Sequence, residues 1–425
     1  MSNALRPVAI VGGMRVPFCR SNTAYSTLSN QDLLSTALSG LVDKYNLQGE
    51  VIDETVAGAV ITHSRDWNLA RESVLSTSLS PLSPGLTMQQ ACGTSLQAAL
   101  TSSAKIATGQ IDCAIAAGSD TVSDVPIVFG RRFARRLVQL GRARSVMDKL
   151  KLLKGFGPSE LKPLPPSVNE PRTLLSMGQH CELMAKEWGI TREAQDQLAA
   201  ESHLKASVAY DEGFFDDLVT PCEKVLRDNN MRPDTSAEKL AGLRKAYDKS
   251  DAGTLTAGNS TPLTDGASSV LLASEEWARE RGLPILAYLT HGQTSAVDFV
   301  AGEGLLMAPT VAVREMLKKA GLTLQDFDFY EIHEAFAAQV LCTLAAWESD
   351  EYCRDRLSLS GALGSIEREK MNVKGSSLAV GHPFAATGAR IVATLAKIID
   401  ENDGGRGLIS VCTAGGMGVT AILER

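Results

Sequence analysis

The chain has 425 residues and a mass of 45.3 kDa, more than one compact core usually contains, so one large layered unit or two to three domains are expected. Apolar residues make up 44% of the chain and charged residues 21%, which excludes extensive disorder and fibrous repeats. The 42 Lys and Arg residues against 49 Asp and Glu residues leave a net charge of −7, so a globally basic nucleic-acid binder is excluded and no nucleic-acid partner is expected.

The first 120 residues have the pattern of an α/β protein with buried strands. Short runs rich in Val, Ile and Ala predict strands, and the segments between them have helical period. The predicted strands cover residues 8–12, 55–61 and 113–118, and the predicted helices cover residues 30–42 and 95–108.

The composition changes after Asp120. Residues 121–250 contain basic clusters, a proline-rich stretch and two helical segments at 177–188 and 192–213, which indicates an inserted loop domain. The α/β pattern resumes with strand-like runs at residues 268–272 and 284–289.

The predicted division of the chain follows from these changes. Residues 1–120 and 251–275 form a first α/β half, residues 121–250 form the inserted loop domain, and residues 276–425 form a second α/β half.

The cysteines and histidines show no metal or disulfide pattern. Eight cysteines are scattered without a C-x-x-C pair, so we expect neither a disulfide framework nor a zinc ribbon, and a reducing compartment is the simpler interpretation. His333-Glu334 begins like H-E-x-x-H, but Ala337 stands where the second ligand would be, so no metal is expected. The chain starts without a presequence and has no apolar run of about 18 residues, so a cytoplasmic location is expected.

The two halves resemble each other where a predicted strand meets a helix. Residues 88–92 precede the helix at 95–108, and residues 376–382 precede a predicted helix at 385–399. In open α/β sheets ligands collect at such junctions, and a helix amino terminus favours anionic groups. These junctions predict a functional site.

Each of these junctions carries one reactive side chain. Cys92 precedes a helix, whose terminal N–H groups lower a thiol pKa and favour the nucleophilic thiolate. The alternative is a buried structural cysteine. His382, between Gly381 and Pro383, is a candidate base, and its alternative is a structural or surface histidine.

Two further junctions carry polar groups. Cys412 follows a strand and enters a glycine-rich turn, where a thiol with a pKa near neutrality can act as an acid or base. The turn also fits a dinucleotide-binding fingerprint, but the chain ends at Arg425 before the helix that this fingerprint requires. His333 and Glu334 follow an apolar run and precede a predicted helix at residues 335–347.

Five sequence blocks, in order, resemble the thiolase family over nearly the whole chain. Residues 90–95 (QACGTS) resemble the nucleophile segment, and residues 258–267 (GNSTPLTDGA) resemble a segment that contacts coenzyme A (CoA) and lies on the dimer side. The other three blocks resemble the remaining active-site segments, and they are residues 333–337, 381–383 and 412–418.

Within the family, the chain most resembles the 3-ketoacyl-CoA thiolases that are β-subunits of fatty acid oxidation complexes. The resemblance rests on His333 where many thiolases carry Asn, on residues 383–388 (PFAATG), and on the long basic loop after Asp120. Two positions depart from the common pattern: Ala414 replaces the first glycine of the turn, and Ser176 stands where other thiolases often have His or Arg.

The resemblance implies a fold: two similar α/β halves, each with a mixed five-stranded sheet, in a five-layer α-β-α-β-α arrangement with an inserted loop domain, forming a homodimer. It implies thiolytic cleavage of 3-ketoacyl-CoA in β-oxidation, with CoA as a substrate and no cofactor. It also implies CoA contacts from Thr261 and Met177, and a hydratase/3-hydroxyacyl-CoA dehydrogenase α-subunit as a partner.

The resemblance also implies roles for the reactive residues. Cys92 attacks the 3-keto carbonyl and His382 activates it, while Cys412 protonates the leaving enolate and later deprotonates CoA. His382 and His333 donate hydrogen bonds to the thioester oxygen. The backbone N–H groups of Cys92 and Ala414 form a second oxyanion hole. Glu334 is either an orienting partner of an imidazole or a helix amino-terminal carboxylate.

The basic segment at residues 131–154 has two interpretations. A charge run is often a solvated face, but the interspersed leucines also suit an amphipathic helix on an anionic membrane or a partner subunit. In the resembling subfamily this loop region contributes to docking and membrane association.

Three other functions remain as alternatives. Biosynthetic Claisen condensation uses the same residues in the opposite direction. A decarboxylating ketosynthase has one Cys and two His residues, and Cys412 argues against it. A non-catalytic acyl-CoA or lipid-binding member of the fold need not retain all four reactive side chains.

Overall fold

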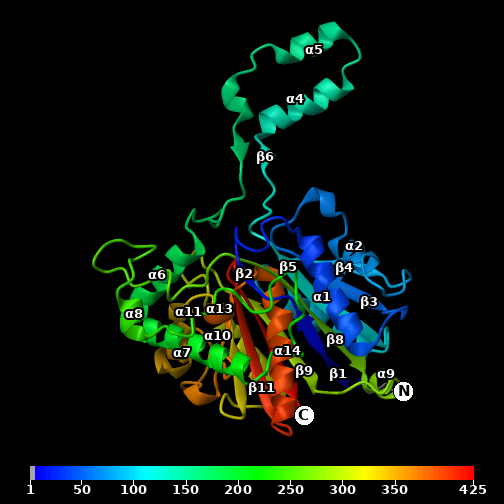
Figure 1. Cartoon of the computed structure of the whole chain (residues 1–425). Coiled ribbons are helices and arrows are strands. Elements are labelled where there is room, and N and C mark those ends of the chain that lie inside the picture. Colours follow the sequence, from blue (N-terminus) through cyan, green and yellow to red (C-terminus); the bar gives the residue numbers. More distant parts are fainter. Residues whose placement is uncertain (1–4) are drawn as a thin grey trace.

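The computed structural model describes residues 5–425, and its strands form one continuous mixed sheet with a small separate ribbon (Figure 1). The order of hydrogen-bonded strands is β10-β11-β12-β9-β1-β8-β5-β3-β4, with β2 paired to β8. The sheet strands are β1 (Val8–Arg15), β2 (Cys19–Arg20), β3 (Glu54–Ala57), β4 (Gly85–Thr87), β5 (Cys113–Asp120), β8 (Thr264–Ser274), β9 (Ala287–Ala296), β10 (Phe329–Ile332), β11 (Arg406–Thr413) and β12 (Met417–Glu424).

The fourteen helices of residues 5–425 lie between and outside these strands. They are α1 (Asn30–Tyr45), α2 (Leu69–Leu75), α3 (Thr94–Ala107), α4 (Arg131–Arg142), α5 (Val146–Leu153), α6 (Met177–Glu187), α7 (Arg192–Asp211), α8 (Ala237–Ala241), α9 (Glu275–Glu280), α10 (Ala308–Ala320), α11 (Ala337–Glu348), α12 (Asp350–Asp355), α13 (Ser377–Val380) and α14 (Thr387–Glu401). None of them is long and apolar enough to cross a membrane.

Two halves of the sheet are joined at a short contact. Strands β4, β3, β5, β8 and β1 belong to the first half, and β9, β12, β11 and β10 belong to the second. Only Ala9 and Ile10 of β1 pair with Tyr288 and Ala287 of β9. The second half contributes four strands to this path, so the expectation of five strands in each half is wrong for it.

The helices cover the sheet halves in five layers. Helices α3 and α14 pack together between the halves and share one apolar cluster with both. Helices α1 and α2 cover the outer face of the first half, and α10 and α11 cover that of the second. Because both faces of the central strands are covered, β1 and β8 are buried along their whole length and have no alternating pattern.

The two central helices pack closely where a small residue lies between them. Helix α14 meets α3 at Gly388, where an added Cβ atom would lie 2.3 Å from the backbone nitrogen of Leu96. This close approach brings the amino termini of α3 and α14, and the reactive residues that precede them, to one place.

The segment at residues 121–250 contains a projecting hairpin and two packed helices. The hairpin is built from α4, α5 and the ribbon of β6 (Val128–Phe129) and β7 (Pro163–Leu164), and Figure 1 shows it extending away from the sheet. Helices α6 and α7 instead contribute Cys181 and Leu198 to apolar clusters that contain residues of α11. The division of the chain into domains stays a prediction.

Two predicted strands at the reactive junctions are absent. Strand β4 ends at Thr87, before the predicted run at residues 88–92, and residues 377–380 form the short helix α13. The left-handed backbone of Ala91 (φ 46°) and Gly381 (φ 104°) turns the chain sharply next to each reactive residue. Both side chains are therefore held by tight turns and not by strand ends.

Candidate active site

The four reactive side chains come from distant parts of the chain and meet between the two sheet halves. The sulfur of Cys92 lies 3.1 Å from Nε2 of His382. The rings of His382 and His333 are 4.2 Å apart between centroids, and one ligand atom from each of Cys92, His333 and His382 lies within 4.8 Å of the others. Cys412 is buried and lies near enough to Cys92 that ionisation of the Cys92 thiol would raise the pKa of Cys412.

The pairing of β10 with β11 explains why His333 and Cys412 are neighbours. The two strands are parallel, and Ile332, the last residue of β10, lies opposite Ser410 near the end of β11. The backbone N–H of His333 donates to the carbonyl of Ser410 over 2.8 Å, two residues before Cys412.

A tight turn holds Cys92 at the start of α3. The Thr94 hydroxyl accepts the backbone N–H of Gln90 (2.8 Å) and donates to the carbonyl of Ala91 (2.7 Å). Gly93 packs so closely against the β11–β12 hairpin that an added Cβ atom would lie 2.7 Å from Val419. Of the eight cysteines, all of which are described, Cys92 is half-buried and the other seven are buried.

His382 is oriented by Thr387. Nδ1 of the ring lies 2.6 Å from the Thr387 hydroxyl, which itself donates to the carbonyl of Pro383 (3.4 Å). The proton between ring and hydroxyl then belongs to Nδ1, because the hydroxyl proton is used elsewhere. Nε2 is left as an acceptor that faces the Cys92 thiol, which is the arrangement a general base needs.

Burial keeps this pair neutral at rest. Burial raises the pKa of Cys92 to about 12, although the backbone N–H groups of Ala414 and of Cys92 itself lower it. Burial and the charge of Arg390 lower the pKa of His382 to about 3. The expected lowering of the Cys92 pKa by the helix terminus is therefore wrong, because the cost of burying a thiolate exceeds the effect of the N–H groups.

Cys412 is also a neutral thiol. It lies in an apolar cluster with Met307, Phe336 and other buried residues, and burial raises its pKa well above the ordinary range. The expected pKa near neutrality is wrong for this structure. As a thiol, Cys412 can donate a proton before it accepts one.

The glycine turn after Cys412 places a backbone donor at Cys92. The N–H of Ala414 interacts with the Cys92 sulfur, and Ala414 has no positive φ, so a side chain there is unstrained. The next N–H, of Gly415, donates to the Glu170 carboxylate over 2.8 Å. Sequence reasoning missed Glu170, because nothing local connects an acid in a proline-rich segment to a turn 245 residues later.

Glu334 does not contact an imidazole. Its carboxylate accepts from the Ser202 hydroxyl (2.7 Å), the Asn372 amide (2.7 Å) and the backbone N–H of Leu378 (3.2 Å). Glu334 therefore anchors α13. The first residue of this helix is Ser377, and its hydroxyl lies 2.9 Å from Nδ1 of His333. The hypothesis that Glu334 orients an imidazole directly is replaced by this anchoring.

The two predicted CoA contacts lie beside the site. Thr261 donates its backbone N–H and its hydroxyl to the carbonyl of Ala335 (3.1 and 3.0 Å), two residues after His333. Met177 begins α6 and packs on the apolar cluster that contains Cys412. Their contact with CoA stays a prediction.

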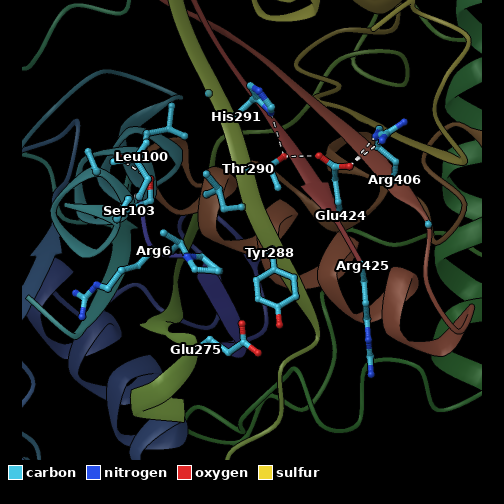
Figure 2. Close-up of a pocket in the computed structure, with 18 of the residues that line it drawn as sticks. Arg6, Leu100, Ser103, Glu275, Tyr288, Thr290, His291, Arg406, Glu424 and Arg425 are labelled. Atoms are coloured by element: carbon cyan, nitrogen blue, oxygen red, sulfur yellow. Dashed lines mark hydrogen bonds and ion pairs between the residues drawn. The ribbon is translucent and has the colours of Figure 1, made fainter. Parts of the chain in front are cut away.

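One cleft in residues 5–425 lies away from the Cys92 cluster. It has a volume of about 970 Å³ and none of the four reactive residues lines it. Figure 2 shows that some of its polar groups are paired with one another: Thr290 donates to Glu424 (2.7 Å), which pairs with Arg406 (2.8 Å). We place the active site at the Cys92 cluster, because a candidate nucleophile and a candidate base are in contact there.

Two family models together match nearly the whole chain. "Thiolase, N-terminal domain" matches residues 8–276 and "Thiolase, C-terminal domain" matches residues 283–425. The chain belongs to the thiolase family. It is therefore an acyltransferase, and the resemblance inferred from the five sequence blocks is confirmed.

Individual thiolases resemble the chain along its full length. The 3-ketoacyl-CoA thiolases of Yersinia pestis (strain Pestoides F) and Yersinia pseudotuberculosis (serotype O:1b, strain IP 31758) are each 41% identical to it over 423 residues, which cover 98% of this chain and 96% of theirs.

Solved thiolase structures share the fold. The Bacillus anthracis acetyl-CoA acetyltransferase has a TM-score of 0.82 at 29% identity and covers 100% of both chains. Human mitochondrial 3-ketoacyl-CoA thiolase in complex with CoA has a TM-score of 0.81 at 26% identity and covers 99% of this chain and 98% of its own. The predicted thiolase fold is confirmed.

Proposed function

We propose that this thiolase cleaves 3-ketoacyl-CoA with CoA to give acetyl-CoA and a chain-shortened acyl-CoA in fatty acid β-oxidation. The observation that carries the proposal is the 3.1 Å contact between Cys92 Sγ and His382 Nε2, at a sulfur that also meets two backbone N–H groups. The 3-ketoacyl-CoA thiolases that are 41% identical to the chain support this substrate class.

In the first half-reaction, Cys92 gives its proton to Nε2 of His382 as the sulfur attacks the 3-keto carbon. The bond between C2 and C3 breaks, which leaves the acyl group on Cys92 and the enolate of acetyl-CoA. Cys412 protonates that enolate. Because both thiols are neutral at rest, each proton moves only when substrate is present.

In the second half-reaction, the Cys412 thiolate takes the proton of incoming CoA. The CoA sulfur attacks the acyl-thioester, and Cys92 leaves and recovers its proton from His382. The thiol and imidazole return to their starting states, so the cycle needs no cofactor besides the substrate CoA.

Two sets of donors face the developing negative charge. The backbone N–H groups of Cys92 and Ala414 stabilise the tetrahedral oxyanion on the acyl carbon. Protonated His382, together with the neutral ring of His333, stabilises the enolate oxygen, and each such donor typically contributes about 3 kcal/mol to the transition state.

We further propose that Thr261 and Met177 contact CoA and that the active protein is a homodimer in the cytoplasm. The dimer is supported by β4, which lies at one end of the sheet in residues 5–425 and carries the exposed Leu86. An end strand has one unpaired edge, which a second copy of the chain can cover. The cytoplasm is supported by the eight cysteines, all of which are free.

The hairpin of residues 128–164 is the proposed docking element for a hydratase/3-hydroxyacyl-CoA dehydrogenase subunit or an anionic membrane. Helices α4 and α5 have no buried residue, and Leu137, Val138, Leu150 and Leu153 are exposed beside the arginines.

The test compares thiolysis of acetoacetyl-CoA and of a long-chain 3-ketoacyl-CoA by the wild type, Cys92→Ala and the control Cys353→Ala. We expect the wild type and the control to cleave the long chain and Cys92→Ala to lose more than about a thousandfold in kcat. Equal rates in Cys92→Ala would exclude Cys92 as the nucleophile. Activity confined to four carbons would instead favour the condensing acetoacetyl-CoA thiolase.

A further inference from the structure

His333 has one ring nitrogen that is bonded and one that is not. Nδ1 lies 2.9 Å from the hydroxyl of Ser377, while Nε2 is fully buried and has no partner among residues 5–425. A buried polar atom without a partner costs free energy unless a ligand satisfies it. The ring faces His382, so the unpaired nitrogen belongs to the reacting centre.

The role of the unpaired nitrogen depends on where the single proton of the neutral ring lies. With the proton on Nε2, His333 is a donor that can stabilise a negative oxygen. With the proton on Nδ1, it presents a lone pair, which would repel that oxygen. Distance alone does not distinguish these tautomers, but the partners of Ser377 do.

Arg390 determines the direction of the Ser377 hydroxyl. The guanidinium of Arg390 donates to Ser377 Oγ over 2.8 Å, and a guanidinium has five donors and no acceptor. Arg390 is itself buried, and it is held by Glu331 at 3.7 Å and by Ser376 at 3.3 Å. The Ser377 hydroxyl must therefore donate its own proton to an acceptor other than Arg390.

His333 Nδ1 is the remaining partner recorded for the Ser377 hydroxyl among the described residues. If Nδ1 also donated, Ser377 would receive two N–H bonds and its buried proton would have no acceptor. The hydroxyl therefore donates to Nδ1, and the ring proton is on Nε2.

We infer that Ser377, held by Arg390, is a positioning residue that keeps His333 as the Nε2–H tautomer, with its donor directed at the thioester oxygen. This inference rests on the proposed function. It gives the two imidazoles opposite tautomers: Thr387 makes His382 an acceptor for the Cys92 proton, and Ser377 makes His333 a permanent donor. The two hydroxyls therefore give the two imidazoles different roles, one as the base and the other as the oxyanion donor.

The first experiment reads the tautomer directly. In the full-length protein labelled with ¹⁵N-histidine, the ring signals of His333 are assigned by their loss in His333→Gln. We expect a protonated Nε2 and a bare Nδ1 in the wild type and in the control Ser73→Ala, which removes a buried hydroxyl of α2 that has no partner among residues 5–425. A protonated Nδ1 in the wild type would overturn the inference, and it would leave the Cys92 result untouched.

The second experiment measures the consequence for catalysis. Ser377→Ala should lower kcat by about 10- to 100-fold with little change in KM, because the lost effect is on the transition state. Ser377→Thr, which retains the hydroxyl, should restore most of the rate, and the control Ser73→Ala should keep the full rate. Unchanged kcat in Ser377→Ala, with the tautomer altered, would show that the hydroxyl does not position a catalytic donor.

Discussion

Cys92 and His382 show how burial sets the chemistry of single residues. The sequence places a thiol before a helix and predicts a thiolate, but the surrounding atoms raise the pKa of Cys92 to about 12 and lower that of His382 to about 3. A neutral pair avoids burying two charges without a substrate to use them. The nucleophile is therefore formed during attack.

The rate of Cys92 alkylation by iodoacetamide should report this protonation state. Because the pKa of Cys92 is raised from 9.0 to about 12, its thiolate fraction should rise about tenfold for each pH unit between about pH 7 and pH 10. The rate, followed by peptide mass spectrometry with Cys92→Ser as the control, should rise in parallel and show no plateau. A plateau at or below about pH 9 would instead indicate a thiolate–imidazolium pair at rest.

At the scale of elements, the hairpin of residues 128–164 is separate from the rest of the protein. Its internal contacts are local: the rings of Phe129 and Phe133 are 4.9 Å apart, those of Phe133 and Phe156 are 5.6 Å apart, and Arg136 pairs with Glu160 at 2.9 Å. Helix α4 has no buried residue, so the hairpin contributes little to the core.

Replacing residues 128–164 with a short Gly/Ser linker should therefore change the free energy of unfolding by less than about 1 kcal/mol, since no buried helix surface is lost. It should also preserve thiolysis of short substrates. Binding to vesicles that contain anionic lipid, measured by sedimentation, should disappear.

The matched variant for this deletion reverses charge without removing the hairpin. Arg131, Arg135 and Arg142 changed together to Glu should lose binding to anionic vesicles as completely as the deletion does. Binding that survives in either variant, or that is equal on uncharged vesicles, would assign the hairpin to a protein partner or to solvent.

At the scale of the whole molecule, stability and catalysis depend on the same central layer. Helices α3 and α14 lie between the two sheet halves and share one apolar cluster with both. The backbones of the two helices approach closely at Gly388, and the same approach places Cys92 and His382 in contact. A larger side chain there would separate the layers.

Gly388→Ala should lower the free energy of unfolding by about 3 kcal/mol, because the new methyl group would overlap the backbone nitrogen of Leu96. Gly141→Ala is the matched control. No atom lies within 4 Å of that methyl group, and alanine favours a helix, so the control should be neutral or slightly stabilising. Urea unfolding measures both, and equal stability of the two variants would contradict the close contact at Gly388.

Local signals in the sequence were sufficient to propose the reactive residues. They also located most of the helices and strands that the sequence analysis predicted. Cys92, His333, His382 and Cys412 were found because glycine turns and strand-to-helix changes are encoded within a few neighbouring residues. The helix predicted at residues 95–108 was confirmed within one residue as α3. The predicted strand at residues 376–382 was wrong because Glu334, from a distant segment, accepts the N–H of Leu378 and stabilises a helical turn there.

The sequence by itself determined the family and the layered α/β class and predicted the candidate reactive residues, because these follow from residue types at short spacing. Only the tertiary structure decided the burial of the two thiols, the hydroxyl partners of the two imidazoles and the anchoring of the glycine turn by Glu170. The physical reason is that burial and hydrogen-bond partners are contacts between residues far apart in the chain, and no local pattern records them.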